Sequence, residues 1–311
     1  MGVKPNFFIL GAPKCGTTAL FEYLRSHPAV FLPQVKEPHF FATDLGGYPA
    51  IKSLDAYHSL FQDARPDQTR VGEASVYYLR STTAAANIRQ YQPDARLIAM
   101  FRNPVDMLHS FHSQLLYVAE ETEEDFEAAW RLQERRARGL DLPPGSRGAF
   151  LLQYREMGRF GSQTQRVLAS FPAGQLKVIL FDDFGADPKR VYDDVIAFLG
   201  LPGDDRAEFP RINENKRARV TWLRNFLRKP PPVVRNAYRS VKQTVGGARM
   251  DALKSAIVRR NTVREHRSPL SPAFRAELIE EFREEVALLA SLLDRDLGHW
   301  TPAAAPASRR G

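Results

Sequence analysis

The chain has 311 residues, a formal net charge of +8, 43% hydrophobic residues and a single cysteine, Cys15. This length is enough for one α/β domain with additions, and one cysteine excludes an internal disulfide, which fits a reducing compartment. The basic balance favours an acidic ligand, a polyanion or an anionic membrane surface. With no apolar run of about 18 residues and no secretion-signal pattern, we expect a cytoplasmic protein.

The first predicted element is a strand at residues 7–10, which leads through Gly11-Ala12-Pro13-Lys14-Cys15-Gly16-Thr17-Thr18 into a helix. Small residues let such a loop wrap around an anion, and the amide groups at a helix start favour negative charge. Lys14, Thr17 and Thr18 add a charge and two hydroxyls. The plainer alternative is a glycine turn with Thr17 as a helix cap. In nucleotide-hydrolase loops the lysine follows the second glycine, whereas Lys14 precedes Gly16, so we expect a different ligand.

An extended segment at residues 29–33 leads into Lys36-Glu37-Pro38-His39-Phe40-Phe41. Partial burial beside aromatic rings could raise the pKa of the Glu37 carboxyl, as a general base needs, with the His39 imidazole beside it. The alternative is a surface loop with a salt-bridged glutamate.

Three further apolar segments, at residues 70–79, 96–101 and 176–181, are predicted strands, with helical patterns between them. Alternation of strands and helices predicts an α/β fold with a doubly wound parallel sheet. Residues 50–70 are predicted to be mainly helical with one buried face, formed by Leu54, Tyr57, His58, Leu60 and Phe61.

Arg102 directly follows the strand at 96–101, and Ser110 lies two turns into the next predicted helix. Ligands of open α/β sheets bind outside the carboxyl ends of the strands. A guanidinium fork and a hydroxyl there could hold a second phosphate. The alternative is an arginine that pairs with a loop carboxylate.

The later elements are predicted as follows. Residues 120–138 form a charged helix with a solvated face, and amphipathic helices cover 150–170, 188–199 and 274–293. Asp182-Asp183 is interpreted as a helix-capping loop, since no histidine or cysteine is near enough in sequence to suggest a metal. Residues 301–311, rich in Ala, Pro and Ser, are predicted to be a disordered tail.

Residues 213–268 form a basic region in which arginine and lysine are interleaved with apolar residues. The plain interpretation is a pair of covering helices with solvated basic faces. The functional alternatives are a lid over the acceptor or a peripheral contact with the inner face of a membrane. No nucleic-acid-binding motif is present, so specific nucleic-acid binding is not expected.

Taken together, these motifs resemble the sulfotransferases that use 3′-phosphoadenosine 5′-phosphosulfate (PAPS), in particular bacterial relatives of the heparan sulfate sulfotransferases. Residues 11–18 resemble the 5′-phosphosulfate loop of the family, and Arg102 with Ser110 resembles its 3′-phosphate pair. Residues 36–41 are similar to the segment that carries the catalytic glutamate, and residues 295–300 to a terminal signature of the bacterial relatives. The resemblance implies a sulfotransferase fold, a P-loop-like parallel sheet flanked by helices with a basic helical lid-like insertion, as one domain over residues 1–300.

The resemblance also implies roles for individual residues. Glu37 would be the base, Lys14 would offset charge on the leaving oxygen, and His39 would orient the acceptor or Glu37. The PAPS donor and its product 3′-phosphoadenosine 5′-phosphate (PAP) would be held without a metal by Lys14, Cys15, Gly16, Thr17, Thr18, Arg102, Ser110, Lys216, Arg217 and Arg219. The acceptor would be bound by Lys36, Glu73, Ser75 and Tyr78.

Two departures bear on the acceptor. Glu73-Ala74-Ser75 has alanine where the glycosaminoglycan enzymes carry lysine, and Phe160 stands where relatives commonly carry tyrosine. We expect a carbohydrate or glycolipid hydroxyl as acceptor. The alternatives are a phenolic or polyketide hydroxyl, a P-loop kinase or nucleotide hydrolase, and a non-enzymatic adaptor for anionic membranes or polyanions.

Overall fold

A computed structural model describes residues 3–47, 51–210, 212, 216–218, 262–264 and 267–302. The chain divides into two compact units. The first comprises residues 1–108, 154–212 and 270–311, and the second comprises residues 109–153 and 213–269.

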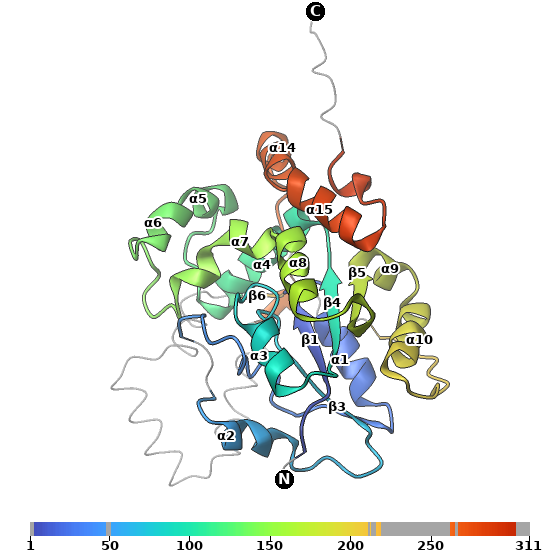
Figure 1. Cartoon of the computed structure of the whole chain (residues 1–311). Coiled ribbons are helices and arrows are strands. Elements are labelled where there is room, and N and C mark those ends of the chain that lie inside the picture. The colour runs from blue at the N-terminus through green and yellow to red at the C-terminus, as the bar shows by residue number, and fades with distance from the viewer. Residues whose placement is uncertain are drawn as a thin grey trace, which may run out of the picture. The chain divides into compact units, whose positions relative to one another are not determined.

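The first unit is built on a five-stranded sheet in the order β2-β3-β1-β4-β5, with all neighbours parallel. The strands are β1 (Phe7–Gly11), β2 (Val30–Phe31), β3 (Arg70–Ala74), β4 (Arg96–Phe101) and β5 (Leu176–Leu180). Every residue of β1 is buried, as expected for a central parallel strand covered on both faces. In Figure 1 the strands run through the centre of the picture, with α10 beside β5. The predicted α/β parallel sheet is confirmed.

Helices flank this sheet. They are α1 (Thr17–Arg25), α2 (Leu54–His58), α3 (Ala84–Tyr91), α7 (Tyr154–Gly158), α8 (Phe160–Ser170), α9 (Phe181–Ala186), α10 (Pro188–Leu199), α14 (Pro272–Glu281) and α15 (Arg283–Leu293). Helix α8 packs against both α3 and α15. Ser271 caps α14 by accepting a hydrogen bond from the Phe274 amide, and Gly200 ends α10 in the left-handed conformation.

Three helical predictions were too long. The pattern at 50–70 forms only α2 and one turn at Ser59–Phe61, and Leu54 is exposed where a buried side chain was expected. The helix predicted over 274–293 is broken at Phe282. The helix predicted over 150–170 is divided into a turn at Ala149–Leu152, α7 and α8.

The second unit contains most of α4 (Pro104–Val118), followed by α5 (Phe126–Arg131) and α6 (Gln133–Ala137). Strands β6 (Lys216–Ala218) and β7 (Thr262–Arg264) pair antiparallel. The single charged helix predicted over 120–138 was wrong, because α5 and α6 are separate, and the predicted solvated face holds for most but not all of its charged residues. Glu121 and Arg136 are buried and form a bidentate ion pair at 2.6 and 2.8 Å. Buried charges persist when they are paired in this way.

Most of the predicted basic region at 213–268, including Arg219, lies outside the described residues, as do residues 303–311 of the predicted tail. Across the described part of the chain, no helix is long and apolar enough to span a membrane.

Candidate active site

The loop between β1 and α1 is held against the neighbouring strands by its backbone. The Ala12 amide donates to the Met100 carbonyl of β4 at 2.7 Å. A Cβ on Gly11 would lie 2.3 Å from the Val76 carbonyl oxygen, and Gly16 has a φ of 92°. Both positions therefore require glycine, because a side chain would clash at the first and be strained at the second. The result is a narrow loop that turns directly into a helix start.

The electrostatics of this loop suit an anion. The first amide groups of α1 have no acceptor within the helix and carry the positive end of its dipole. Lys14 and Thr18 are half-buried, whereas Thr17 and Cys15 are buried. Burial raises the pKa of the Cys15 thiol to about 12, although the charges of Arg102 and Lys14 act in the opposite direction. Cys15 is therefore a neutral, packed residue of the loop that donates to the Pro13 carbonyl.

The segment that carries Glu37 lies beside this loop. The Glu37 amide donates to the Ala74 carbonyl at the end of β3 at 3.0 Å, which fixes the segment at the carboxyl edge of the sheet. The Lys36 ammonium donates to the Thr18 hydroxyl at 2.8 Å and to the Glu37 carboxylate at 3.3 Å. Lys36 thus joins the predicted base, Glu37, to the anion loop. The resemblance implied that Lys36 binds the acceptor, and it did not predict this contact.

Glu37 and His39 face one another. His39 Nε2 lies 3.6 Å from Glu37 Oε2, and the imidazole is buried and stacked on the Tyr77 ring with centroids 4.8 Å apart. Burial acts to raise the pKa of the Glu37 carboxyl, but the adjacent His39 imidazole and the Lys36 ammonium outweigh it and hold the pKa below its ordinary value. The expected rise was therefore wrong. Glu37 is instead a carboxylate that stays ionised at neutral pH.

A second carboxylate, Glu73, is buried beneath this segment. It accepts hydrogen bonds from the hydroxyls of Tyr57 at 3.0 Å, Ser75 at 2.7 Å and Tyr78 at 2.6 Å. Burial raises its pKa to about 7, against the lowering effect of these three hydrogen bonds. Glu73, Ser75 and Tyr78 were expected to bind the acceptor, and all three have side chains buried within the unit.

Arg102 follows β4 at the same edge of the sheet, with its guanidinium 4.9 Å from the Phe181 ring centroid. The next residue, Asn103, donates to the Trp300 carbonyl at 3.0 Å and accepts from the Val105 amide at the start of α4. The terminal signature thus supports the turn that carries Arg102.

Asp182 and Asp183 lie in the first turn of α9, not in the capping loop that was predicted. Asp182 accepts from the Trp300 indole at 2.8 Å, and Asp183 accepts from Arg295 at 3.1 Å. These carboxylates therefore anchor the terminal signature, a role with no local sequence pattern to reveal it.

The remaining residues of the predicted donor site lie in the second unit. Ser110 is a buried residue of α4, and Lys216 and Arg217 belong to strand β6. Arg219 lies outside the described residues.

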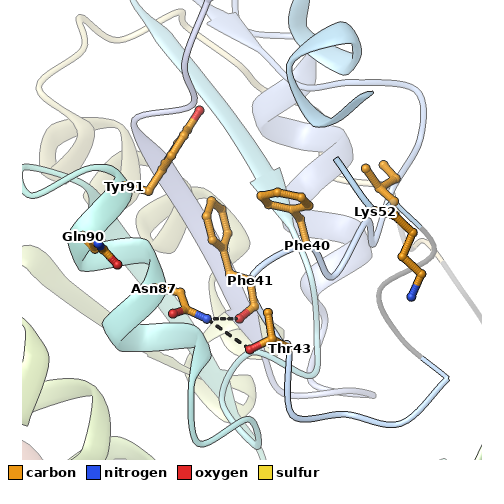
Figure 2. A pocket seen from close by; sticks show the side chains of 8 residues that line it. Phe40, Phe41, Thr43, Lys52, Asn87, Gln90 and Tyr91 are labelled. Atoms are coloured by element: carbon orange, nitrogen blue, oxygen red, sulfur yellow. Dashed lines mark hydrogen bonds between the residues drawn. The ribbon is translucent and has the colours of Figure 1, made fainter. Parts of the chain in front are cut away.

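Phe40 and Phe41, at the end of the segment that carries Glu37, line an open pocket of about 710 Å³ (Figure 2). Its wall includes the rings of Phe40, Phe41 and Tyr91 and the amides of Asn87 and Gln90. The Asn87 amide donates to the Phe41 carbonyl at 2.9 Å, so it fixes one side of the pocket. Aromatic faces with adjacent amides and hydroxyls are suited to an amphipathic ligand.

Within the part of the chain that the structure describes, no three His, Cys, Asp or Glu side chains cluster in a way that could hold a metal ion.

Comparison with known proteins gives consistent results. The family profile described as "Sulfotransferase domain" matches residues 4–290. The crystal structure of a sulfotransferase from Alicyclobacillus acidocaldarius is 30% identical, with a TM-score of 0.69 over 96% of this chain and 99% of that one.

Among curated proteins, carbohydrate sulfotransferase 15 of Rattus norvegicus is 33% identical over 147 residues, covering 34% of this chain and 26% of its own. Bifunctional heparan sulfate N-deacetylase/N-sulfotransferase 4 of Mus musculus is 29% identical over 206 residues, covering 63% of this chain and 22% of its own. The chain thus matches about a quarter of the length of these curated relatives. The profile match and the full-length structural match show that this chain belongs to the sulfotransferase family.

Proposed function

We propose that the protein transfers a sulfuryl group from PAPS to a hydroxyl of a carbohydrate or glycolipid. The observation that carries the proposal is that the Lys36 ammonium donates hydrogen bonds both to the Glu37 carboxylate and to the Thr18 hydroxyl of the anion loop. A group transfer needs its base and its donor site held side by side, because positioning lowers the barrier.

The residues of the loop fit the donor. Gly11 lies against the Val76 carbonyl and Gly16 is left-handed, which fixes the course of the loop, and Lys14 and Thr18 are only half-buried. Lys14, Gly16, Thr17 and Thr18 would hold the 5′-phosphosulfate, with Cys15 packed below them, and Arg102 and Ser110 would hold the 3′-phosphate. Lys216, Arg217 and Arg219 are proposed to add charge at that phosphate. When bound there, PAPS supplies the sulfuryl group.

In the proposed reaction, the acceptor oxygen bonds to sulfur while the bond from sulfur to the leaving phosphate oxygen of PAP breaks. The Glu37 carboxylate takes the proton of the acceptor hydroxyl, as its low pKa leaves it ionised and able to accept. Lys14 offsets the negative charge that grows on the leaving oxygen, together with the loop amides. His39, beside Glu37, orients that carboxylate, and Lys36 keeps it near the loop.

The acceptor class is proposed from similarity and from the pocket. Curated relatives are named carbohydrate sulfotransferase 15 and heparan sulfate glucosamine 3-O-sulfotransferase 3B1, and the second name specifies a sugar oxygen. The pocket wall of Phe40, Tyr91 and Gln90 offers ring faces and an amide, which can contact the apolar faces and hydroxyls of a sugar. Phenolic and polyketide hydroxyls are the competing acceptors.

Calorimetry with PAP, ATP and anionic lipid vesicles, without added metal, tests the donor. We expect tight binding of PAP and weak binding of ATP. Tight ATP binding that depends on magnesium would support a kinase, and binding to vesicles alone would support a membrane adaptor at the cytoplasmic face. Incubation with radiolabelled PAPS and a panel of desulfated glycosaminoglycan oligosaccharides, glycolipids and phenols then identifies the acceptor class.

A further inference from the structure

Glu73 is connected to the catalytic segment, residues 36–41, through two hydroxyl groups. Each hydroxyl donates to Glu73 and accepts from the segment. Its carboxylate accepts from the hydroxyls of Ser75 and Tyr78. A hydroxyl has one proton to donate and two lone pairs that accept. When both hydroxyls give their protons to Glu73, their oxygens are left to accept from other donors.

Those other donors are backbone amides of the catalytic segment. The His39 amide donates to Ser75 Oγ at 3.0 Å, and the Phe41 amide donates to the Tyr78 hydroxyl oxygen at 3.3 Å. The carboxylate of Glu73 therefore sets the orientation of two hydroxyls, and each hydroxyl holds one amide of the segment.

The segment needs such support because its backbone is strained. Glu37 and His39 have φ values of 64° and 50°, in the left-handed region that non-glycine residues rarely adopt. Residues in that region persist when surrounding contacts hold them there. The amide of His39 is one of the two that the hydroxyls hold, so one of these hydrogen bonds acts directly at a strained position and the other acts two residues later, at Phe41.

We propose that Glu73 is a positioning residue of sulfuryl transfer, which holds Glu37 and His39 in place through the hydroxyls of Ser75 and Tyr78. This role rests on the proposed function, in which Glu37 is the base. Glu73 itself touches no reacting atom, because its carboxylate is covered by the three hydroxyls.

The protonation of Glu73 affects this arrangement. A protonated carboxyl must donate a hydrogen bond, so one hydroxyl has to turn its proton away from Glu73. The titratable groups that face Glu73 are Tyr57 and Tyr78, which donate to it, and Glu37 and Tyr91, which interact with its charge. Because the pKa of Glu73 is raised to about 7, turnover should increase as the pH rises through that region.

Four variants of the full chain test the proposal: Glu73→Gln, Ser75→Ala, Tyr78→Phe and Tyr57→Phe. The first three interrupt the connection between Glu73 and the segment. Tyr57→Phe is the matched control, since it also removes a hydroxyl from Glu73 but none that holds a segment amide. The readouts are PAP affinity, hydrogen exchange of the peptide that contains His39 and Phe41, and the pH profile of kcat with the acceptor that the panel identifies.

We expect Glu73→Gln, Ser75→Ala and Tyr78→Phe to speed exchange in that peptide and to lower kcat by about 10-fold each, the effect of one lost positioning hydrogen bond, with PAP affinity unchanged. Glu73→Gln should also abolish the rise of kcat near pH 7. Tyr57→Phe should keep the slow exchange at high pH and shift the rise to higher pH, because the lost hydrogen bond was lowering the pKa of Glu73.

Wild-type exchange rates in all three interrupting variants, or an unchanged pH profile in Glu73→Gln, would overturn the positioning role. Failure of the proposed function would look different, as a wild-type protein that neither binds PAP nor transfers sulfuryl. The exchange measurement needs no acceptor and separates the two results.

Discussion

The Lys36 ammonium donates a hydrogen bond to the Thr18 hydroxyl over 2.8 Å. Lys36 belongs to the segment after β2, and Thr18 lies in the first turn of α1. The bond joins segments that follow strands β2 and β1, which are separated in the sheet by β3 alone. Because the same ammonium lies 3.3 Å from Glu37, a change at the donor loop can reach the base through one side chain.

Replacement of this lysine should therefore affect both donor binding and the base. Lys36→Met removes the charge that helps to hold the pKa of Glu37 below its ordinary value, so that pKa should rise and the acid limb of kcat should move to higher pH. PAP affinity should fall by about 5- to 10-fold, the effect of one ordinary lost hydrogen bond, because Thr18 of the anion loop loses its donor. The matched control is Lys189→Met, whose side chain pairs with Asp193 on α10 at 2.7 Å. Equal pH profiles for both variants would contradict the role of Lys36.

Glu37→Gln keeps the size of the side chain and removes its ability to take a proton. We expect kcat to fall by about 10²- to 10⁴-fold, the usual contribution of a general base, with PAP affinity close to that of the wild type. Rate measurements with radiolabelled PAPS and calorimetry with PAP check the two parts. Glu22→Gln, at an exposed pair with Arg25 on α1, is the control for loss of a negative charge. Near-normal turnover of Glu37→Gln would remove Glu37 as the base and favour His39.

The single cysteine should be chemically inert in the folded protein. Burial raises the pKa of Cys15 to about 12, so at neutral pH almost none of it is thiolate, the reactive form. We expect iodoacetamide to leave folded Cys15 unmodified over hours at pH 7 and to alkylate it completely after denaturation in guanidinium chloride. Mass spectrometry of the intact protein reports both. Rapid alkylation of the native protein would show that the thiol is accessible and that its pKa is low.

Strands β6 and β7 lie in the region that was predicted to be helical, and the anion-binding role of the loop and the catalytic role of Glu37 stay predictions. The sequence was sufficient to predict the five strands of the parallel sheet and the loop between β1 and α1. Each of them is a continuous run whose apolar pattern or glycine spacing reflects local geometry. The hydrogen bonds around Glu73 were not predictable in this way, because Tyr57 and Tyr78 reach it from different elements. The pattern of residues 50–70 did place Tyr57 on a buried face, but it gave no sign that the tyrosine hydroxyl meets a carboxylate.

Charged residues account for the main errors at the level of side chains. The periodicity of residues 120–138 suggests a solvated face, yet Glu121 and Arg136 are buried because each neutralises the other. Similarly, the pKa of Glu37 falls where burial alone predicts a rise, because Lys36 and His39 stand beside it. Which charged group lies within a few ångströms of another depends on how the chain folds. Composition and sequence spacing do not reveal it, so neither the buried ion pair nor the direction of the pKa shift was predictable.

The last prediction concerns two adjacent carboxylates on α9. Asp182 accepts from the buried Trp300 indole at 2.8 Å, whereas Asp183 pairs with the exposed Arg295. Asp182→Ala should cost about 1–3 kcal/mol in urea unfolding, because it leaves the indole N–H unpaired, and Asp183→Ala should cost less than about 1 kcal/mol. The Trp300 carbonyl accepts from Asn103, next to Arg102, so Asp182→Ala should also weaken PAP binding more than Asp183→Ala does. If the two variants lose the same stability and affinity, Trp300 does not anchor the turn that carries Arg102.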